Sequence, residues 1–324
     1  MKFAIPLVRL SVTHYLLLIS VIVLFLIPTA VPYRSNPFFL SVIVAVFLYG
    51  FLSQSWNILG GYTGQFSFGH QAFFGIGAYT TAILFTRLGT PPLVGFLVSA
   101  GLTSLISLGI GLPSLRLKGP FFVFSTIAFA EILRIFFSGW SFTYAMEGLW
   151  YPITEDSWYN LQFHADRTPY YYIALCMMLL STLIVFLIRR SRSGYYFVAI
   201  REDEDAAESV GINTTKYKLL STAISAALTG IGGAFYAQYI LFLLPSDFMS
   251  IDMGAKIFLP SIIGGKGTIL GPLLGAFLLV TTSEYLRFFL GGRPAINLAV
   301  YGALLIIFSI SMPAGIIGFL RKHR

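Results

Sequence analysis

A stretch of small and polar residues interrupts the apolar sequence between residues 60 and 79. It reads GGYTGQFSFGHQAFFGIGAY. Its hydroxyl, amide and imidazole groups can donate and accept hydrogen bonds, but the stretch holds no nucleophile with a matching base. Its chemistry is therefore that of binding a polar solute, with no catalytic residue and no metal site. The polar candidates are Thr63, Gln65, Ser67, His70 and Gln71.

Glycine disfavours a helix here, by about 1 kcal/mol per residue relative to alanine. Backbone that leaves a helix inside a bilayer must find partners in the protein or in a water-filled cavity. Transporters often place such interrupted helices beside their substrate. We therefore predict a break over 60–70 that borders a solute pathway. The glycines that permit it are Gly60, Gly61, Gly64 and Gly69.

A second stretch, IGGKGTILGPLLGAF at 263–277, shares the paired and spaced glycines and hints at an internal duplication. We predict that Gly264, Gly265, Gly267 and Gly271 shape the same pathway. Among the ionisable residues, His70 could contact the solute, relay a proton or bridge backbone groups. Glu131 and Arg134 can pair on one helix face, as a functional or a structural pair.

Composition places all of these elements in a membrane. The 324 residues are 56% hydrophobic and only 10% charged, and the mean hydropathy is +0.81. The net charge of +8 comes from basic residues in short loops, which indicates membrane orientation and not nucleic-acid binding. A single cysteine excludes a disulfide framework, and no GxxxxGK[ST] phosphate-binding loop is present. Energy for transport would have to come from an ion gradient or from a partner.

The apolar runs predict an all-α, polytopic transmembrane helical bundle with broken helices and about 8–10 membrane segments. We treat 1–324 as one transmembrane domain and 10–30 as a retained first span. The 253–264 segment is too short to cross alone. The predicted spans lie near 10–30, 38–59, 71–87, 93–111, 120–138, 169–188, 218–244, 253–264, 267–286 and 295–318.

The bias of lysine and arginine between loops predicts that both termini are cytoplasmic. On this orientation 189–217 is a cytoplasmic loop and 139–168 an extracytoplasmic one. The minority of basic residues on the outer side consists of Arg34, Arg87, Arg167, Arg287 and Arg293. Rows of small residues at intervals of four predict close helix packing, within the chain or at a subunit interface. They are Ala226, Gly230 and Ala234 in one span and Gly267, Gly271 and Gly275 in another.

The loop REDEDAAESVGINTTKYK, residues 201–218, opens with acidic residues that suit a helix N-terminus. Gly211 is a suitable C-cap, so we predict an exposed helix at 202–210. A plain solvated loop helix is the alternative to a functional one.

Three motifs together resemble the membrane permease of branched-chain amino-acid ABC importers, the LivM type. They are NILGGYTGQFSFGHQAFFGIGAYTTAIL (57–84), the loop AIREDEDAAESVGINTTKYKLL (199–220) and GGKGTILGPLLGAFLL (264–279). The resemblance runs in the same order over most of the chain. It implies a multi-pass protein of a bacterial or archaeal plasma membrane that is itself no enzyme and imports branched-chain or similar hydrophobic amino acids by alternating access.

The resemblance also implies partners and a coupling site. The partners are a second permease subunit, two cytoplasmic ATPase subunits that hold ATP and magnesium, and an extracytoplasmic binding protein, all within membrane lipid. This chain would bind no cofactor. Residues 205–211 are similar to the EAAxxxG loop by which such permeases contact the ATPase, with Asp205 in place of the first Glu. The implied coupling residues are Arg201, Asp203, Asp205, Ala206, Ala207, Glu208 and Gly211.

Two features leave the function open at this level. The outer loop WSFTYAMEGLWYPITED at 140–156 lacks the glycine-rich stretch expected there, and relatives of such permeases also serve urea, short amides and other amino acids. From a different class, an ion-coupled secondary transporter could use Glu131 or His70. A membrane scaffold ranks last, because it has no use for polar breaks.

Overall fold

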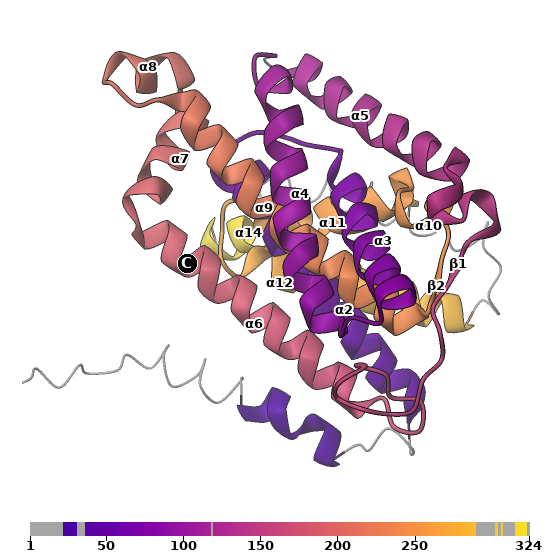
Figure 1. The fold of residues 1–324 in the computed structure, drawn as a ribbon. Coiled ribbons are helices and arrows are strands. Elements are labelled where there is room, and N and C mark those ends of the chain that lie inside the picture. Colours follow the sequence, from indigo (N-terminus) through magenta and orange to yellow (C-terminus); the bar gives the residue numbers. More distant parts are fainter. Residues whose placement is uncertain are drawn as a thin grey trace, which may run out of the picture.

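The protein is a bundle of helices with very little β-structure (Figure 1). The computed structural model describes residues 22–30, 36–117, 119–289, 302–303, 306 and 315–322. The predicted spans at 10–30 and 295–318 therefore fall mostly outside the described residues. Elsewhere helices form where the apolar runs predict them.

Seven long helices lie in the described part of the chain. They are α2 (Pro37–Trp56), α3 (His70–Leu88), α4 (Pro92–Ser114), α5 (Pro120–Gly139), α6 (Thr168–Arg190), α9 (Thr214–Ile240) and α12 (Gly271–Phe289). The shorter helices are α7 (Arg192–Glu202), α8 (Glu204–Ser209), α10 (Pro245–Phe248), α11 (Ile251–Gly265) and α14 (Gly315–Lys322). Two short strands, β1 (Leu149–Trp150) and β2 (Phe242–Leu243), pair antiparallel.

Five helical stretches in the described part of the chain are long and apolar enough to cross a membrane. They are Pro37–Tyr62, Pro92–Ser114, Pro120–Gly139, Thr168–Arg190 and Thr214–Ile240. Helices α3 and α12 have 19 residues each, close to the length that a crossing needs. The predicted fold, a polytopic helical membrane protein, is confirmed.

Several bounds differ from the prediction. Helix α9 begins four residues before the predicted span and ends at Ile240, where Leu241 adopts a left-handed conformation with φ 63° and the chain enters β2. Helix α12 begins at Gly271, so Gly267 lies outside it and the predicted row of three helical glycines is wrong at that position. The two remaining members, Gly271 and Gly275, pack against the backbone of α11.

Side-chain caps fix where the shorter elements start. Ser191 accepts a hydrogen bond from the Gly194 amide at 3.2 Å and begins α7. Asn213 caps α9 in the same way, accepting from Lys216 N at 2.9 Å. Such caps satisfy amides that have no partner inside the helix, and each contributes about 1 kcal/mol. They set the register of α7 and α9 relative to the segment between them.

The core lies where α9 crosses α3 and α4, and where α2 packs against α6, α11 and α12 (Figure 1). Backbones meet at these crossings. A Cβ atom on Gly77 would collide with the carbonyl of Gly230, and one on Gly233 with the carbonyl of Phe74. Two roles were predicted for the small-residue row of α9, and these contacts support the first, which is close packing within the chain.

Helix α6 separates two polar regions. The 139–168 loop precedes its first residue, and α7 and α8 follow its last one, so these regions lie at opposite ends of the bundle (Figure 1). A helix of this length, 23 residues, spans about 34 Å at 1.5 Å per residue. The two regions can therefore meet different partners on opposite sides of a membrane.

Replacing Gly233 tests the α3–α9 crossing. Gly233→Ala places a methyl group against the Phe74 carbonyl, and such overpacking costs about 1–3 kcal/mol. We expect a lower unfolding temperature in detergent, followed by loss of the monodisperse peak on heating. The control is Gly101→Ala on α4, which has open space around the new Cβ and should keep or raise stability. Equal behaviour of the two variants would contradict the crossing.

Candidate functional site: two glycine-rich breaks and the segment beside them

The first break starts later than the sequence predicts. Helix α2 continues into one turn of π-helix, η1 (Asn57–Tyr62), and only residues 63–69 are non-helical. Gly60 and Gly61 therefore lie within a helical turn and not in the break. Their small size is needed for contact, because a Cβ on Gly60 would collide with the Trp56 indole and one on Gly61 with Asn57 Oδ1. A π-turn of this kind is common at functional sites.

Protein groups satisfy much of the polar backbone of this break. Gly64 has φ 75°, which favours glycine, and turns the chain away from the helix axis. Two of the predicted polar side chains bind backbone: Thr63 Oγ1 donates to Ile58 O at 3.1 Å, and Ser67 Oγ accepts from Gly69 N at 3.3 Å. The Ser67 carbonyl accepts from Trp56 Nε1 at 2.7 Å. Gln65 N donates to Leu59 O at 3.1 Å.

His70 bridges helices. Its Nε2 lies 2.7 Å from Ser225 Oγ, and that hydroxyl donates its proton to Ser55 O at 2.6 Å. Nε2 must therefore carry the hydrogen, since the serine proton is already used. The ring links α3, α9 and α2, which matches the bridging role among those predicted. Its Nδ1 and the Oε1 of neighbouring Gln71 are buried without a hydrogen-bond partner in the described part of the chain.

The second break connects α11 and α12. Gly265 and Gly267 have φ values of 123° and 71°, conformations that side chains with a Cβ rarely adopt. Thr268 closes the turn: its Oγ1 donates to Gly265 O at 2.6 Å and accepts from Gly271 N at 3.0 Å. Gly264 lies in the last turn of α11, where a Cβ would collide with the Gly271 carbonyl.

The two breaks meet through Asn57. Its Oδ1 accepts from Gly267 N at 2.8 Å, and its Nδ2 donates to Thr268 O at 2.8 Å. A Cβ on Gly61 would also lie 2.6 Å from Gly267 N, so the two backbones touch. Lys266 Nζ stands 4.7 Å above the ring of Phe66, which adds a cation–π contact. The two glycine-rich segments singled out in the sequence thus form one junction.

Sequence reasoning missed two residues of this junction. Asn57 and Gln54 are fully buried near the end of α2, and Gln54 Nε2 donates to Ile269 O at 2.5 Å. The available signal was their spacing of three residues at the end of an apolar run. That spacing places both amides on one helix face.

The coupling segment folds as predicted at its centre. Helix α8 spans Glu204–Ser209, with Asp203 as N-cap accepting from Ala206 N at 2.9 Å. Gly211 has φ 86° and donates to Glu208 O at 2.9 Å, which ends the helix. Ala207 is buried, whereas Asp205, Ala206 and Glu208 are exposed. The predicted 189–217 loop is otherwise more ordered than expected, because α7 and the first turn of α9 occupy much of it.

Two charged residues join this segment to the bundle. Lys218 on α9 is almost fully buried, and its Nζ lies 2.5 Å from Glu204 Oε1 at the start of α8. Arg201, in the last turn of α7, donates from Nη1 to Gly61 O at 3.1 Å. Arg201 therefore reaches inward to the first break. A hollow of about 550 Å³ separates α8 from this break, lined on its two sides by Gly64, Gln65 and Phe66 and by Glu204, Asp205 and Lys218.

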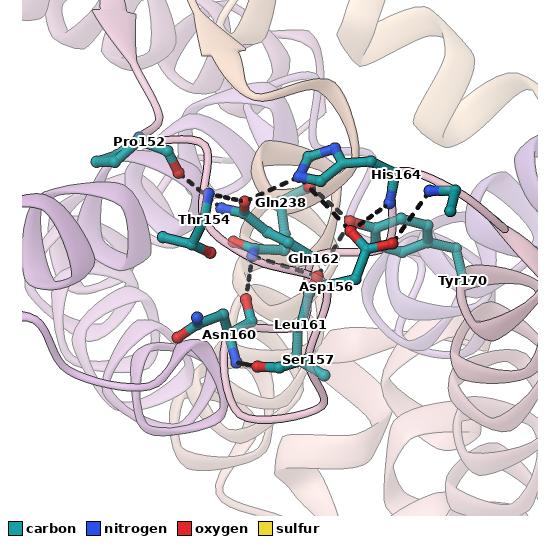
Figure 2. Close-up of polar contacts among 11 residues, drawn as sticks. Pro152, Thr154, Asp156, Ser157, Asn160, Leu161, Gln162, His164, Tyr170 and Gln238 are labelled. Atoms are coloured by element: carbon teal, nitrogen blue, oxygen red, sulfur yellow. Dashed lines mark hydrogen bonds and ion pairs between the residues drawn. The ribbon is translucent and has the colours of Figure 1, made fainter.

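The 139–168 loop forms a rigid platform at the other end (Figure 2). Gln162 is its centre: Oε1 accepts from Thr154 N, and Nε2 donates to Pro152 O, both at 2.8 Å. Gln238 on α9 donates to Asn160 O at 2.5 Å, which ties the loop to the bundle. Among the aromatic residues of this loop, Tyr151 is buried, while Trp140, Trp150, Trp158 and Tyr159 are exposed.

Asp156 closes the last turn of this loop (Figure 2). Its carboxylate accepts from His164 N at 2.8 Å and from Ala165 N at 3.1 Å. These two backbone bonds lower the pKa of Asp156 below its usual value. The turn is therefore most stable when the carboxylate is ionised.

The remaining predicted pair also forms. Arg134 Nε donates to Glu131 Oε2 at 2.9 Å on α5, with both side chains partly exposed. Helix α5 contacts the first break five residues before Glu131, where Thr126 Oγ1 accepts from Phe68 N at 3.0 Å. In the searched part of the chain, no group of histidine, cysteine and acidic residues is arranged to hold a metal ion.

The apolar spanning helices identify a multi-pass membrane protein. The buried junction of two broken segments is typical of a permease. Comparison with known families identifies which: residues 38–309 match the model described as branched-chain amino acid transport system / permease component. The chain belongs to this family.

Individual relatives agree with the family. The chain is 28% identical to the high-affinity branched-chain amino acid transport system permease protein LivM of Salmonella typhimurium, over 99% of this chain and 79% of that protein. It is 23% identical to the probable branched-chain amino acid transport permease protein LivM of Methanocaldococcus jannaschii, over 83% of this chain and 90% of the relative. The LivH permease of S. typhimurium is 30% identical over 42% of each chain. No solved structure matches the chain significantly.

Asn57 offers a direct test of the junction. Asn57→Leu leaves the Gly267 amide and the Thr268 carbonyl unpaired, and each such buried group costs about 1–3 kcal/mol. We expect faster hydrogen–deuterium exchange over 266–270 in Asn57→Leu than in wild type. Asn57→Asp keeps the acceptor but loses the donor, so its exchange rate should lie between those of wild type and Asn57→Leu. Ser107→Ala is the control, because that hydroxyl binds only a carbonyl of its own helix. Unchanged exchange in Asn57→Leu would contradict the junction.

The Asp156 turn should depend on pH. Because folding lowers the pKa of Asp156, its stabilisation is complete above the unfolded value of about 3.9 and is lost as pH falls through the lowered folded value. We expect an acid transition in the fluorescence of Trp158, which packs on Phe163 with ring centroids 4.9 Å apart. Asp156→Asn should lose the transition and report the open turn already at pH 7. Trp158→Phe is the control that shows how much of the fluorescence change comes from Trp158. An acid transition that persists in Asp156→Asn would contradict the role of Asp156 in this turn.

Proposed function

We propose that this chain is the membrane permease subunit of an ATP-driven importer for branched-chain or similar hydrophobic amino acids. The observation that carries the proposal is α8, an exposed helix capped at both ends and anchored to α9 by the buried Glu204–Lys218 pair. An anchored helix can pass a displacement to the bundle, which a loosely attached loop cannot. Its position in a chain of this permease family supports a contact with ATPase subunits.

The proposal assigns a side of the membrane to each end of α6. The α7–α8 segment faces the cytoplasm, where two ATPase subunits bind ATP and magnesium and engage Asp203, Asp205, Ala206 and Glu208. Ala207 is buried beneath this surface, and Gly211 ends the helix. The 139–168 platform faces outward and receives a substrate-binding protein. A second permease subunit completes the pathway, and the similarity to both LivM and LivH relatives supports such a pair.

Within this machine the two breaks shape the pathway on its cytoplasmic side. The residues concerned in the first segment are Gly60, Gly61, Thr63, Gly64, Gln65, Ser67 and His70. Those of the second are Gly264, Gly265, Gly267 and Gly271. Their contact with one another supports a joint role, since a change in one break alters the backbone partners of the other.

An ion-coupled transporter fits the structure less well. Glu131 is paired with Arg134 on the partly exposed face of α5, and His70 is held by Ser225. Neither residue lies free beside a cavity as a proton relay requires. A change of cargo within the same machinery, to urea, short amides or other amino acids, stays as the second candidate because the outer loop departs from the family pattern.

The test is uptake of labelled leucine, with urea in parallel, into vesicles that carry this chain with its ATPase, second permease and binding-protein subunits. We expect leucine uptake that disappears without ATP. Urea uptake alone would change the cargo and keep the machine. Leucine uptake driven by an ion gradient through this chain alone would overturn the proposal.

Glu131→Gln is the matched variant for the same assay. It removes a partly exposed ion pair, which is worth at most about 1 kcal/mol. In an ATP-driven importer the variant should keep uptake near the wild-type rate. In a proton-coupled carrier that uses Glu131, uptake would be lost.

A further inference from the structure

Arg201 occupies the point where the coupling segment meets both breaks. It lies in the last turn of α7, two residues before Asp203, the N-cap of α8. A displacement of the start of α8 would therefore act on the backbone two residues after Arg201. Its side chain is 33% exposed, so most of it is buried against the protein.

The guanidinium reaches both glycine-rich segments at once, at the π-turn that precedes the first break and at the second break itself. Nη1 donates to Gly61 O at 3.1 Å at the end of η1. A Cβ on Gly267 in the second break would lie 2.6 Å from the same Nη1. Nε and Nη2 both bind Glu202 Oε1, at 3.0 and 2.5 Å, which holds the plane of the guanidinium in place. A planar group with several fixed donors is suited to joining separate backbones.

The same side chain explains glycine at two positions far apart in the sequence. A Cβ on Gly64 would lie 2.8 Å from Arg201 Cγ, and Gly267 makes room for the guanidinium as described. Both glycines also have positive φ, 75° and 71°. Gly64 in the first segment and Gly267 in the second thus both leave room for the same arginine.

Space for movement exists beside this contact. The hollow of about 550 Å³ lies between Gly64–Phe66 and the start of α8. Across it, Lys218 and Glu204 keep α8 attached to α9. A displacement of α8 can therefore proceed into open space while its end toward α7, and Arg201 with it, is carried along.

We propose that Arg201 is the positioning residue that links the α7–α8 junction to both glycine-rich breaks, so that a displacement of α8 changes the two breaks together. This inference rests on the proposed function, because the displacement of α8 would come from the ATPase subunits. It gives Arg201 an inward role, in place of the ATPase contact that the motif resemblance implies.

The test uses the complete importer in lipid vesicles and compares Arg201→Ala with wild type. We expect basal ATP hydrolysis to persist while leucine uptake falls about tenfold, as for a lost hydrogen bond from a charged donor. The number of ATP molecules hydrolysed per leucine then rises about tenfold. Arg192→Ala is the matched control, because this exposed arginine of the same helix makes no hydrogen bond or ion pair with the described residues.

Hydrogen–deuterium exchange separates positioning from a purely structural role. When a non-hydrolysable ATP analogue locks the wild-type complex, exchange should change over 204–209, over 61–68 and over 266–270. In Arg201→Ala the change should remain at 204–209 and vanish from both breaks. If Arg201→Ala does not assemble, Arg201→Lys is tested in its place. One ammonium group cannot bind Gly61 and Glu202 with the geometry of a guanidinium. Arg201→Lys should therefore raise the ATP-to-leucine ratio by a smaller factor than Arg201→Ala.

The outcomes separate the two proposals. A wild-type complex without ATP-dependent leucine import overturns the proposed function, and this inference with it. Normal import by wild type together with an unchanged ATP-to-leucine ratio in Arg201→Ala, or in Arg201→Lys where Ala does not assemble, overturns the inference alone. So does a response of both breaks to the ATP analogue in the variant.

Discussion

The junction depends on one constraint: backbone that leaves a helix inside an apolar bundle must find hydrogen-bond partners in the protein. Each unsatisfied group there costs several kcal/mol. Asn57 meets this requirement for the second break by binding the Gly267 amide and the Thr268 carbonyl with one side chain. Because the amide is short, it can do so only if α2 and the α11–α12 turn are in backbone contact. Glycine at 61 and 267 permits that contact.

The rest of the junction follows from this contact. The π-turn at Asn57–Tyr62 moves Gly61 toward Gly267 before the chain leaves the helix. Trp56 is fully buried and donates to Ser67 O, which fixes the path of the first break. His70 then starts α3 and binds Ser225 of α9. The residues of the first break are thus held by the end of α2, by η1 and by Thr126 of α5.

The sequence allowed the helices and the chemistry of α8 to be predicted, because these depend on local patterns. Apolar runs mark the spans, and Asp203 with Gly211 are capping residues of known preference. Long-range partners could not be predicted in this way. Asn57 resembles any polar residue at the end of an apolar helix, and its partners lie about two hundred positions away. The start of the first break was predicted too early, because glycine propensity is a local signal, whereas Gly60 and Gly61 lie within the π-turn that continues α2.

The position of the breaks bears on how such a bundle can work. They lie at the α7–α8 end, next to Arg201, and not midway between the two polar ends of α6. A displacement of α8 would therefore reach the breaks through one side chain, that of Arg201. The 139–168 platform lies a helix length away. Packed backbones do not deform continuously, so a junction of glycines in contact favours a few discrete arrangements over gradual bending.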